Sequence, residues 1–301
     1  MKRKVIRLTI TLKGSDPNGA PEVFTSEGEY NQIRSTGLRV LVNVTNGNGS
    51  ISPNANIQVY GLAMDKMAKL MRIQWNTMKA IMNTVLIEVG EEGGELSKVY
   101  EGNITFARID TSNAPNVFLN IESQSAIVEK LRPVEPVSFD GNMDAAKMIE
   151  FIATEKMGYR FENNGASLII ADGGLYEKTY MDMIHDIANA ADFDLYIEQN
   201  LIAICPRGVA RKRKIPVLTP KSGLVGYPTP DVRGVIFKCF YNPDILFGGV
   251  VKIDKSIIEI CNNEWRIFGM TIILEANQPD GAWFIDVSAS WRNANDVAIA
   301  R

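Results

Sequence analysis

Apolar and polar residues alternate through most of the first 130 residues, and this alternation predicts antiparallel β-structure. Every second residue is apolar from Lys4 to Lys13 and again from Gly37 to Asn46. Four further segments, each bounded by Gly, Asn, Pro or Ser, continue the series: NIQVYGL, NTVLIEVG, KVYEGNITFARID and NVFLNIESQS. Between two of them, helical spacing predicts a short helix with Met64, Met67, Ala68 and Met71 on one side. Six strands and one helix predict a small barrel or sandwich, and barrel closure would remove exposed sheet edges.

The pattern changes after the proline-rich segment Leu131–Phe139, which we interpret as a linker. Asn142 can cap a helix that ends at Gly158 and carries Ala145, Met148, Ile149, Ile152 and Ala153 on one face. The segment YRFENNGASLIIA then predicts a hairpin turned at Asn163–Gly165.

A second helix and hairpin follow. Thr179 with Asp182 resembles a capping box, and Ile184, Ile187, Ala188 and Ala191 line the helix. Residues Asp194–Pro206 predict a second hairpin. One α-β-β unit thus occurs twice between Gly141 and Pro206, and we expect a compact α+β domain with two helices against a sheet.

A second break in composition, Arg207–Pro216, precedes a return to β-structure. Strands are predicted in GVIFKCFYN, GVVKIDKS, EWRIFGMTIILEAN and WFIDVSASW, and a polar tail follows. The predicted fold is mainly β with an α+β middle domain: two small antiparallel β-barrels flank the two-helix domain. The predicted domains are residues 1–132, 133–206 and 207–301.

Composition narrows the class of protein. The 301 residues are 46% hydrophobic and 22% charged, with a net charge of −3, so a strongly cationic surface that coats nucleic acid is not expected. No run of 18 apolar residues predicts a membrane span, and the N-terminus lacks the apolar core of a signal peptide, which favours production in a cytoplasm. We expect Cys205, Cys239 and Cys261 to be reduced and buried.

The residues that usually carry chemistry are sparse. His185 is the sole histidine, no serine lies in a GxSxG context, and no glycine-rich phosphate loop is present. The carboxylate pairs Glu91–Glu92, Asp140–Asp144 and Asp182–Asp186 fit turns and helix starts. We therefore predict no catalytic residue, no metal, no cofactor and no enzymatic activity.

Two features predict an interaction surface. The basic run Arg211, Lys212, Arg213 and Lys214 is either a solvated interdomain loop or a docking loop for an acidic partner. In Lys221–Ile253, the prolines of GYPTPD are expected to keep that segment out of a strand, whereas both faces of VIFKCFYN are apolar. The turn NPDILFGG is expected to expose Ile245, Leu246 and Phe247 unless something covers them. The candidate interface residues are Tyr227, Phe240, Ile245, Leu246, Phe247 and the four residues of the basic run.

Four segments occur in an order and at a spacing that resemble a known family. They are SPNANIQVYGLAMDKMAKL, VEPVSFDGNMDAAKMIEFIATEKMGYRFENNG, LTPKSGLVGYPTPDVRGVIFKCFYNPDILFGGVVKI and WRIFGMTIILEANQPDGAWFIDVSAS. The chain resembles the baseplate hub proteins of contractile-tailed bacteriophages, the tail hub or late-control-protein-like family, from Lys4 to Trp291.

This resemblance implies a structural subunit of the virion, assembled in the host cytoplasm. Three copies would form a ring of six similar barrels that adapts a hexameric tail tube to a trimeric spike. The implied partners are further copies of the chain, the tail tube protein, the central spike protein, the tape-measure protein and baseplate wedge proteins. DNA would only pass through the lumen, and no membrane insertion is implied.

Two other hypotheses stay open at this point. A carbohydrate- or peptidoglycan-binding tail module would use exposed aromatic residues, for which Trp75, Trp265, Trp283 and Trp291 are candidates. A hydrolase would use an unrecognised acid pair among Asp140, Asp144, Glu91 and Glu92.

Overall fold

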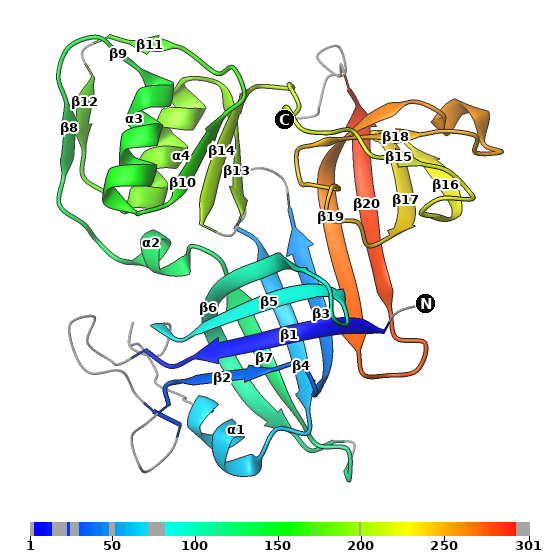
Figure 1. Cartoon of the computed structure of the whole chain (residues 1–301). Coiled ribbons are helices and arrows are strands. Elements are labelled where there is room, and N and C mark those ends of the chain that lie inside the picture. Colours follow the sequence, from blue (N-terminus) through cyan, green and yellow to red (C-terminus); the bar gives the residue numbers. More distant parts are fainter. Residues whose placement is uncertain are drawn as a thin grey trace. The chain divides into compact units, whose positions relative to one another are not determined.

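The computed structural model of the chain (Figure 1) describes residues 3–13, 23–24, 30–47, 52–71, 82–112, 114–171, 173–198 and 200–292. The chain divides into two compact units. Unit 1 comprises Met1–Thr45, Pro53–Val128 and Ile272–Trp283, and unit 2 comprises Asn46–Ser52, Glu129–Thr271 and Phe284–Arg301. The predicted boundaries at residues 132/133 and 206/207 stay predictions.

Unit 1 is built on a curved sheet whose strand order is β19-β3-β4-β7-β6-β5-β1-β2. Its strands are β1 (Lys4–Thr11), β2 (Gln32–Ser35), β3 (Arg39–Asn46), β4 (Asn54–Tyr60), β5 (Thr84–Glu91), β6 (Leu96–Asp110), β7 (Phe118–Gln124) and part of β19 (Glu264–Ala276). The six predicted strands are confirmed, and β2 is an addition that pairs with β1.

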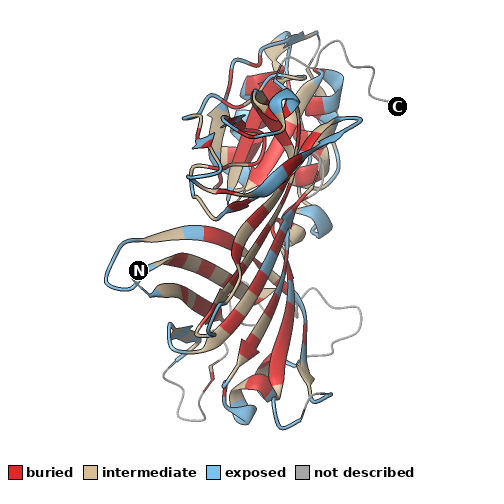
Figure 2. Ribbon diagram, turned by 90° about the vertical axis from the view of Figure 1, so that its right-hand side faces the viewer, coloured by how far each residue is buried: buried red, intermediate tan, exposed pale blue. Residues whose placement is uncertain are grey.

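Burial alternates along these strands, as Figure 2 shows. In β3 and β4 the core side chains are Val40, Val42, Val44, Ala55, Ile57 and Val59, each almost fully buried. Their neighbours in sequence point to the other face of the sheet. The hydrophobic effect on one face therefore fixes which residues the other face presents.

Two short helices accompany this sheet: α1 (Met64–Leu70), which belongs to unit 1, and α2 (Ile127–Leu131). The predicted helix is confirmed in α1, but its predicted face is wrong: Met67 and Leu70 are buried, whereas Met64, Ala68 and Met71 are exposed. Trp75 lies outside the described residues. In the predicted linker, α2 ends at Leu131, and Val137–Phe139 form the short strand β8.

The α+β part of unit 2 packs α3 (Ala145–Phe151), continued by the π-helix Ile152–Lys156, beside α4 (Tyr180–Ala190). A three-stranded sheet of order β10-β14-β13 lies next to these helices (Figure 1). Its strands are β13 (Phe193–Glu198), β14 (Leu201–Pro206) and β10 (Arg160–Asn163). Short strands β8 (Val137–Phe139) and β12 (Gly174–Tyr176) form one pair, and β9 (Met143–Asp144) and β11 (Ile169–Ile170) form another.

Two predictions for the first half of this part are wrong. The helix cap is Asp144, whose carboxylate accepts a hydrogen bond from the amide of Ala146 at 2.8 Å, and not Asn142. The hairpin at Asn163–Gly165 does not form, because β10 pairs in parallel with β14. The side-chain oxygen of Asn163 accepts from the amides of Gly165 and Ala166, which closes a turn that leads the chain away toward β9. The α-β-β repeat is therefore not reproduced in the strand pairing.

The second half behaves as predicted. Thr179 accepts a hydrogen bond from the amide of Asp182 at 3.2 Å and caps α4. The four apolar residues assigned to the helix face, Ile184, Ile187, Ala188 and Ala191, are buried. Strands β13 and β14 form the second hairpin.

The remaining part of unit 2 contains β15 (Val217–Leu218), β16 (Leu224–Asp231), β17 (Gly234–Phe240), β18 (Val250–Ile253), a 3₁₀ turn (Glu259–Cys261), and residues of β19 and β20 (Trp283–Trp291). The order β16-β17-β20-β19 makes β16 an edge strand. The prediction that GYPTPD lies outside a strand is wrong. Pro228 and Pro230 are tolerated because β16 is an edge and its register with β17 is irregular between Val225 and Thr229.

The chain is thus mainly β with four α-helices among the described residues. The strand order runs from the edge strand β16 to the edge strand β2 and, over the described part, does not close into a barrel. Within that part no helix is long and apolar enough to cross a membrane.

Candidate functional site

The hairpin of β16 and β17 carries the two most accessible of the hydrophobic candidate residues, Tyr227 and Phe240. On β17, Val235, Phe237 and Cys239 are buried, while Ile236 and Phe240 on the opposite side are 46% and 49% exposed. Tyr227 lies in the irregular part of β16 and is 70% exposed. The prediction that both faces of β17 are apolar is confirmed, and the second apolar face is open to solvent in the single chain.

Strand β20 extends this second face. Phe284 lies opposite Phe240, and their rings stack with centroids 5.5 Å apart at 27°. Lys238, between Ile236 and Phe240, forms an ion pair with Asp286 at 3.3 Å and lies 5.7 Å from the Phe284 ring. We call Tyr227, Ile236, Phe240 and Phe284 the aromatic face. Tyr227, Ile236 and Phe240 are exposed and Phe284 is half-buried, and exposed apolar residues gathered on one hairpin are typical of a surface that another molecule covers.

The NPDILFGG turn is not part of that surface. Ile245 and Phe247 are buried and Leu246 is half-buried, so the chain itself covers the apolar residues of this turn and they are not exposed. The ring of Phe247 packs edge-on against Tyr196 of β13, with centroids 5.3 Å apart. Gly248 makes this approach possible, because a Cβ there would lie 2.5 Å from the Tyr196 ring. The turn therefore packs the α+β part against the β part inside unit 2.

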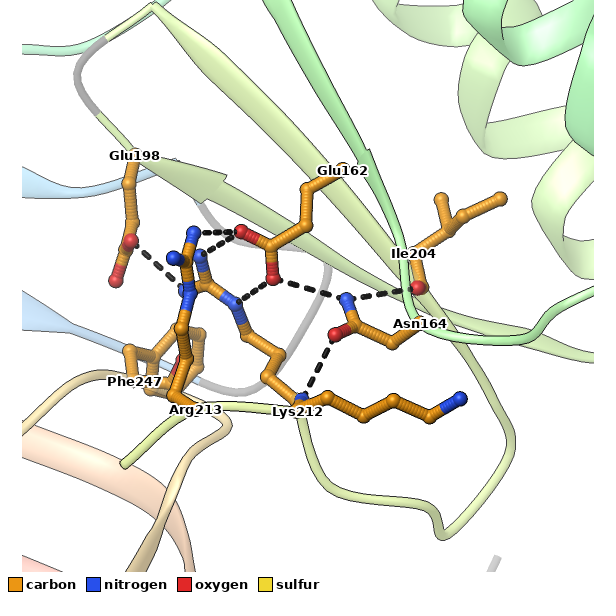
Figure 3. Close-up of polar contacts among 8 residues, drawn as sticks. Glu162, Asn164, Glu198, Ile204, Lys212, Arg213 and Phe247 are labelled. Atoms are coloured by element: carbon orange, nitrogen blue, oxygen red, sulfur yellow. Dashed lines mark hydrogen bonds and ion pairs between the residues drawn. The ribbon is translucent and has the colours of Figure 1, made fainter. Parts of the chain in front are cut away.

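The basic run is also largely used inside the unit, as Figure 3 shows. The side chain of Arg211 is 1% exposed. Its guanidinium donates to Glu162 at 3.1 and 3.2 Å, to Glu198 at 2.8 Å and to the carbonyl of Phe247 at 3.1 Å. Neither interpretation of the run describes Arg211, because it is neither solvated nor available to a partner.

The other three residues of the run lie around this centre. The amide of Lys212 donates to the side-chain oxygen of Asn164 at 2.8 Å, Arg213 pairs with Glu162, and Lys214 pairs with Asp244 at 2.8 Å. The side chains of Lys212, Arg213 and Lys214 are exposed. Their contact with an acidic partner stays a prediction.

Charge pairing decides the protonation of this cluster. Burial alone would raise the pKa of Glu162, but hydrogen bonds from Arg211 and Asn164 and the charge of Arg211 outweigh it and lower that pKa to about 2. Burial opposes the charged form of Arg211, yet Glu198 and Glu162 raise its pKa above the ordinary value. The cluster is therefore a fixed ion network at neutral pH.

The family is decided by comparison with known proteins. The family model described as baseplate hub gp41 matches residues 9–278 of the chain. The chain belongs to the baseplate hub gp41 family. It is therefore a structural protein of the phage tail baseplate, and a component of the virion.

Several solved structures have a fold similar to that of this chain. A tail protein from Neisseria meningitidis MC58 has a TM-score of 0.58 at 9% identity, over 94% of this chain and 96% of that one. The 43 kDa tail protein of prophage MuSo2 from Shewanella oneidensis has a TM-score of 0.56 at 9% identity, over 98% of both chains. A chain of the Francisella PdpA–VgrG complex has a TM-score of 0.54 at 8% identity, over 96% of this chain and 58% of that one. Comparison with curated protein sequences found no match.

The residues that could have carried chemistry have structural positions in the hub fold. Asp144 and Asp182 belong to helix starts, and His185 is half-buried on α4, where burial lowers its pKa against the opposing charges of Asp182 and Asp186. All three cysteines are buried as predicted, and burial raises the pKa of Cys205 and Cys239 to about 12. Over the described part of the chain, no group of His, Cys, Asp and Glu is placed to hold a metal ion.

Sequence reasoning missed two members of the aromatic face. Ile236 belongs to VIFKCFYN, for which two apolar faces were predicted, but it was not named as an interface residue. Phe284 follows Trp283 in WFIDVSASW, so strand alternation alone places it on the face opposite the buried Trp283. The alternation of side chains along the strand was therefore the signal that could have identified Phe284 as an outward-facing residue.

Proposed function

We propose that this hub protein forms a trimeric ring in a contractile tail, adapting a hexameric tail tube to a trimeric spike around a channel for DNA and the tape-measure protein. In the single chain, Tyr227, Ile236 and Phe240 are accessible to solvent at an edge hairpin. Because burying such residues is favourable, a second copy of the chain is the expected cover. The aromatic face is the observation that carries this proposal.

Two further features support the proposal. The chain has a strand-rich part at each end of the sequence, so a trimer would hold six such parts. Six similar parts suit a match to a tail tube with six-fold symmetry. In this proposal each part closes as a barrel in the ring. A similarly folded chain occurs in the Francisella PdpA–VgrG complex, so the fold is used within a multi-protein assembly. The proposed partners are the tube, spike, tape-measure and wedge proteins, with assembly in the host cytoplasm.

A carbohydrate-binding tail module is the alternative that the sequence left open. Trp265 and Trp283 are buried, and Trp291 packs on Trp265 with ring centroids 4.7 Å apart. Three of the four candidate tryptophans thus pack against other residues of the chain. None of these contacts favours a flat aromatic surface that would bind a sugar.

The test is the oligomeric state and symmetry of the purified chain. Mass photometry should give a particle of about 100 kDa, three times the 33.4 kDa chain, and negative-stain electron microscopy should show three-fold rings with a central hole. A chain that stays monomeric, alone and after addition of tube and spike proteins, would contradict the proposal.

A further inference from the structure

The outer face of β3, β4 and β7 in unit 1 carries side chains that are unusual for a strand surface. The register places Asn43 opposite Asn56 and Asn56 opposite Glu122. The next row holds Leu41, Gln58 and Asn120, and a third holds Thr45, Asn54 and Gln124. Asn120 is buried, and we call the remaining carboxamide-bearing residues of these rows the carboxamide face: Asn43, Asn54, Asn56, Gln58 and Gln124.

Packing does not explain these residues. Asparagine is depleted in strands because its side chain competes for backbone hydrogen bonds. Asn43, Asn54 and Asn56 are exposed, and the core lies on the opposite side of the same strands. A threonine, valine or lysine at these positions would suit the strand better. These residues are disfavoured in strands and gain no packing that would compensate for it. Such positions point to a function of the surface.

The face also carries little charge. Among the outward positions of β3, β4 and β7, Glu122 is the carboxylate and Arg39 is the cation, at the end of the sheet. Arg39 is held by Glu275 at 2.9 and 3.0 Å and lies 4.5 Å from the Tyr60 ring. Ordinary solvent-facing surfaces carry roughly 25–35% charged residues of mixed sign. On the neighbouring strand β6, the exposed Arg108 lies opposite Asn120 and borders the face with one cation. The exposed residues Asn43, Asn54 and Asn56 themselves offer no positive charge that pairs with phosphate.

We propose that the carboxamide face lines the path of DNA through the hub. The inference rests on the proposed ring and adds which face of the chain turns toward the channel. Duplex DNA carries one charge per about 1.7 Å, and each lysine or arginine that pairs with a phosphate releases counterions and strengthens binding. Neutral amides keep a layer of water and form no ion pairs, so DNA passes along them without being held.

A single cysteine locates the face directly. The native cysteines are buried, so Asn56→Cys creates one accessible thiol for a small maleimide-gold label. We expect gold inside the ring by electron microscopy. Gold on the outer rim of intact rings would overturn this inference while leaving the proposed function standing. Failure to form rings, for both the native and the substituted chain, would instead overturn the proposed function and this inference with it.

A charge test asks whether neutrality of the face matters. The variant Asn43→Lys/Asn54→Lys/Asn56→Lys should hold a fluorescent duplex of about 20 base pairs, with strong salt dependence, because nine lysines of a trimer converge on one path. The matched control places the same charge at exposed loop positions of unit 1: Thr111→Lys, Asn116→Lys and Gln278→Lys. We expect at least about 10-fold tighter DNA binding for the face variant than for the control.

Two outcomes of that experiment count against the proposal. Equal DNA binding by both lysine variants would show that the face does not border a shared channel. Binding of the native chain to a glycan array, lost in Asn56→Ala, would make the face a sugar-binding surface instead.

Discussion

At the residue scale, Arg211 shows how a cation in a basic run becomes a core residue. Burying a guanidinium costs free energy unless charge and hydrogen bonds compensate. Here Glu162, Glu198 and the carbonyl of Phe247 provide that compensation, and they come from different elements of unit 2. The cluster therefore depends on every member, since removing one leaves another charge buried without its partner.

Arg211→Met is expected to destabilise the chain by about 3–5 kcal/mol, because Glu162 and Glu198 would lose their shared counter-charge. The measurement is the free energy of unfolding by urea. Lys214→Met is the matched control: its pair with Asp244 is exposed and screened by solvent, so its loss should change the free energy of unfolding little. Similar losses in the two variants would contradict the assigned role of Arg211.

Acid should weaken the same cluster. The pKa of Glu162 is about 2 in the folded chain, below its ordinary value of 4.5, so its ionised form stabilises the fold above pH 4.5. That contribution is lost as the pH falls from 4.5 toward 2. Glu162→Gln should therefore flatten the fall of the melting temperature across this window, whereas substitution of the exposed Glu155 by Gln should leave the slope unchanged.

At the scale of elements, the turn after Ile245 positions the α+β part against the β part of unit 2. Gly248→Ala would combine a φ of +77° with a Cβ 2.5 Å from the Tyr196 ring. Gly93→Ala is matched in backbone strain, at φ +76°, but meets nothing within 4 Å. We expect a cost of about 1–2 kcal/mol for Gly93→Ala and a clearly larger one for Gly248→Ala, measured by thermal and urea unfolding. Equal costs would show that Tyr196 moves aside freely.

The same scale shows what the sequence could predict. Long alternating segments such as Arg39–Asn46 were predictable because one buried face fixes their pattern. The strand Gln32–Ser35 was not, since Ile33 is its one apolar residue, and Leu224–Asp231 was hidden by its prolines. The parallel pairing of β10 with β14 joins residues about forty positions apart and leaves no local signal.

The candidate site also has features that could be predicted from local sequence and features that could not. Tyr227 and Phe240 were named as candidate interface residues, and both are exposed in the single chain, while their contact with a partner stays a prediction. The burial of Arg211 was not predictable, since its partner Glu162 lies 49 residues away. A run of four cations indicates solvent exposure unless such distant carboxylates are known.

At the scale of the whole molecule, the two units present sheet faces of opposite character. The carboxamide face of unit 1 is polar and hydrated, so it can stay in contact with water in the assembled hub. The aromatic face of unit 2 gains free energy when covered. In the proposed ring, this difference favours the polar face for the channel and the aromatic face for contact between copies.

The aromatic face therefore carries the last prediction. Phe240→Asp/Phe284→Asp should weaken the trimer by about 2 kcal/mol or more per residue, roughly 30-fold each in the dissociation constant. Mass photometry over a dilution series measures this. The two aspartates would lie opposite each other where the stacked rings were, so the isolated chain should melt at a lower temperature, and circular dichroism must show that it is folded at the temperature of the measurement. Leu175→Asp, 61% exposed on β12, is the control that should leave the trimer intact. If the double variant stays trimeric while folded, the copies meet through a different surface, and the aromatic face belongs to another baseplate partner.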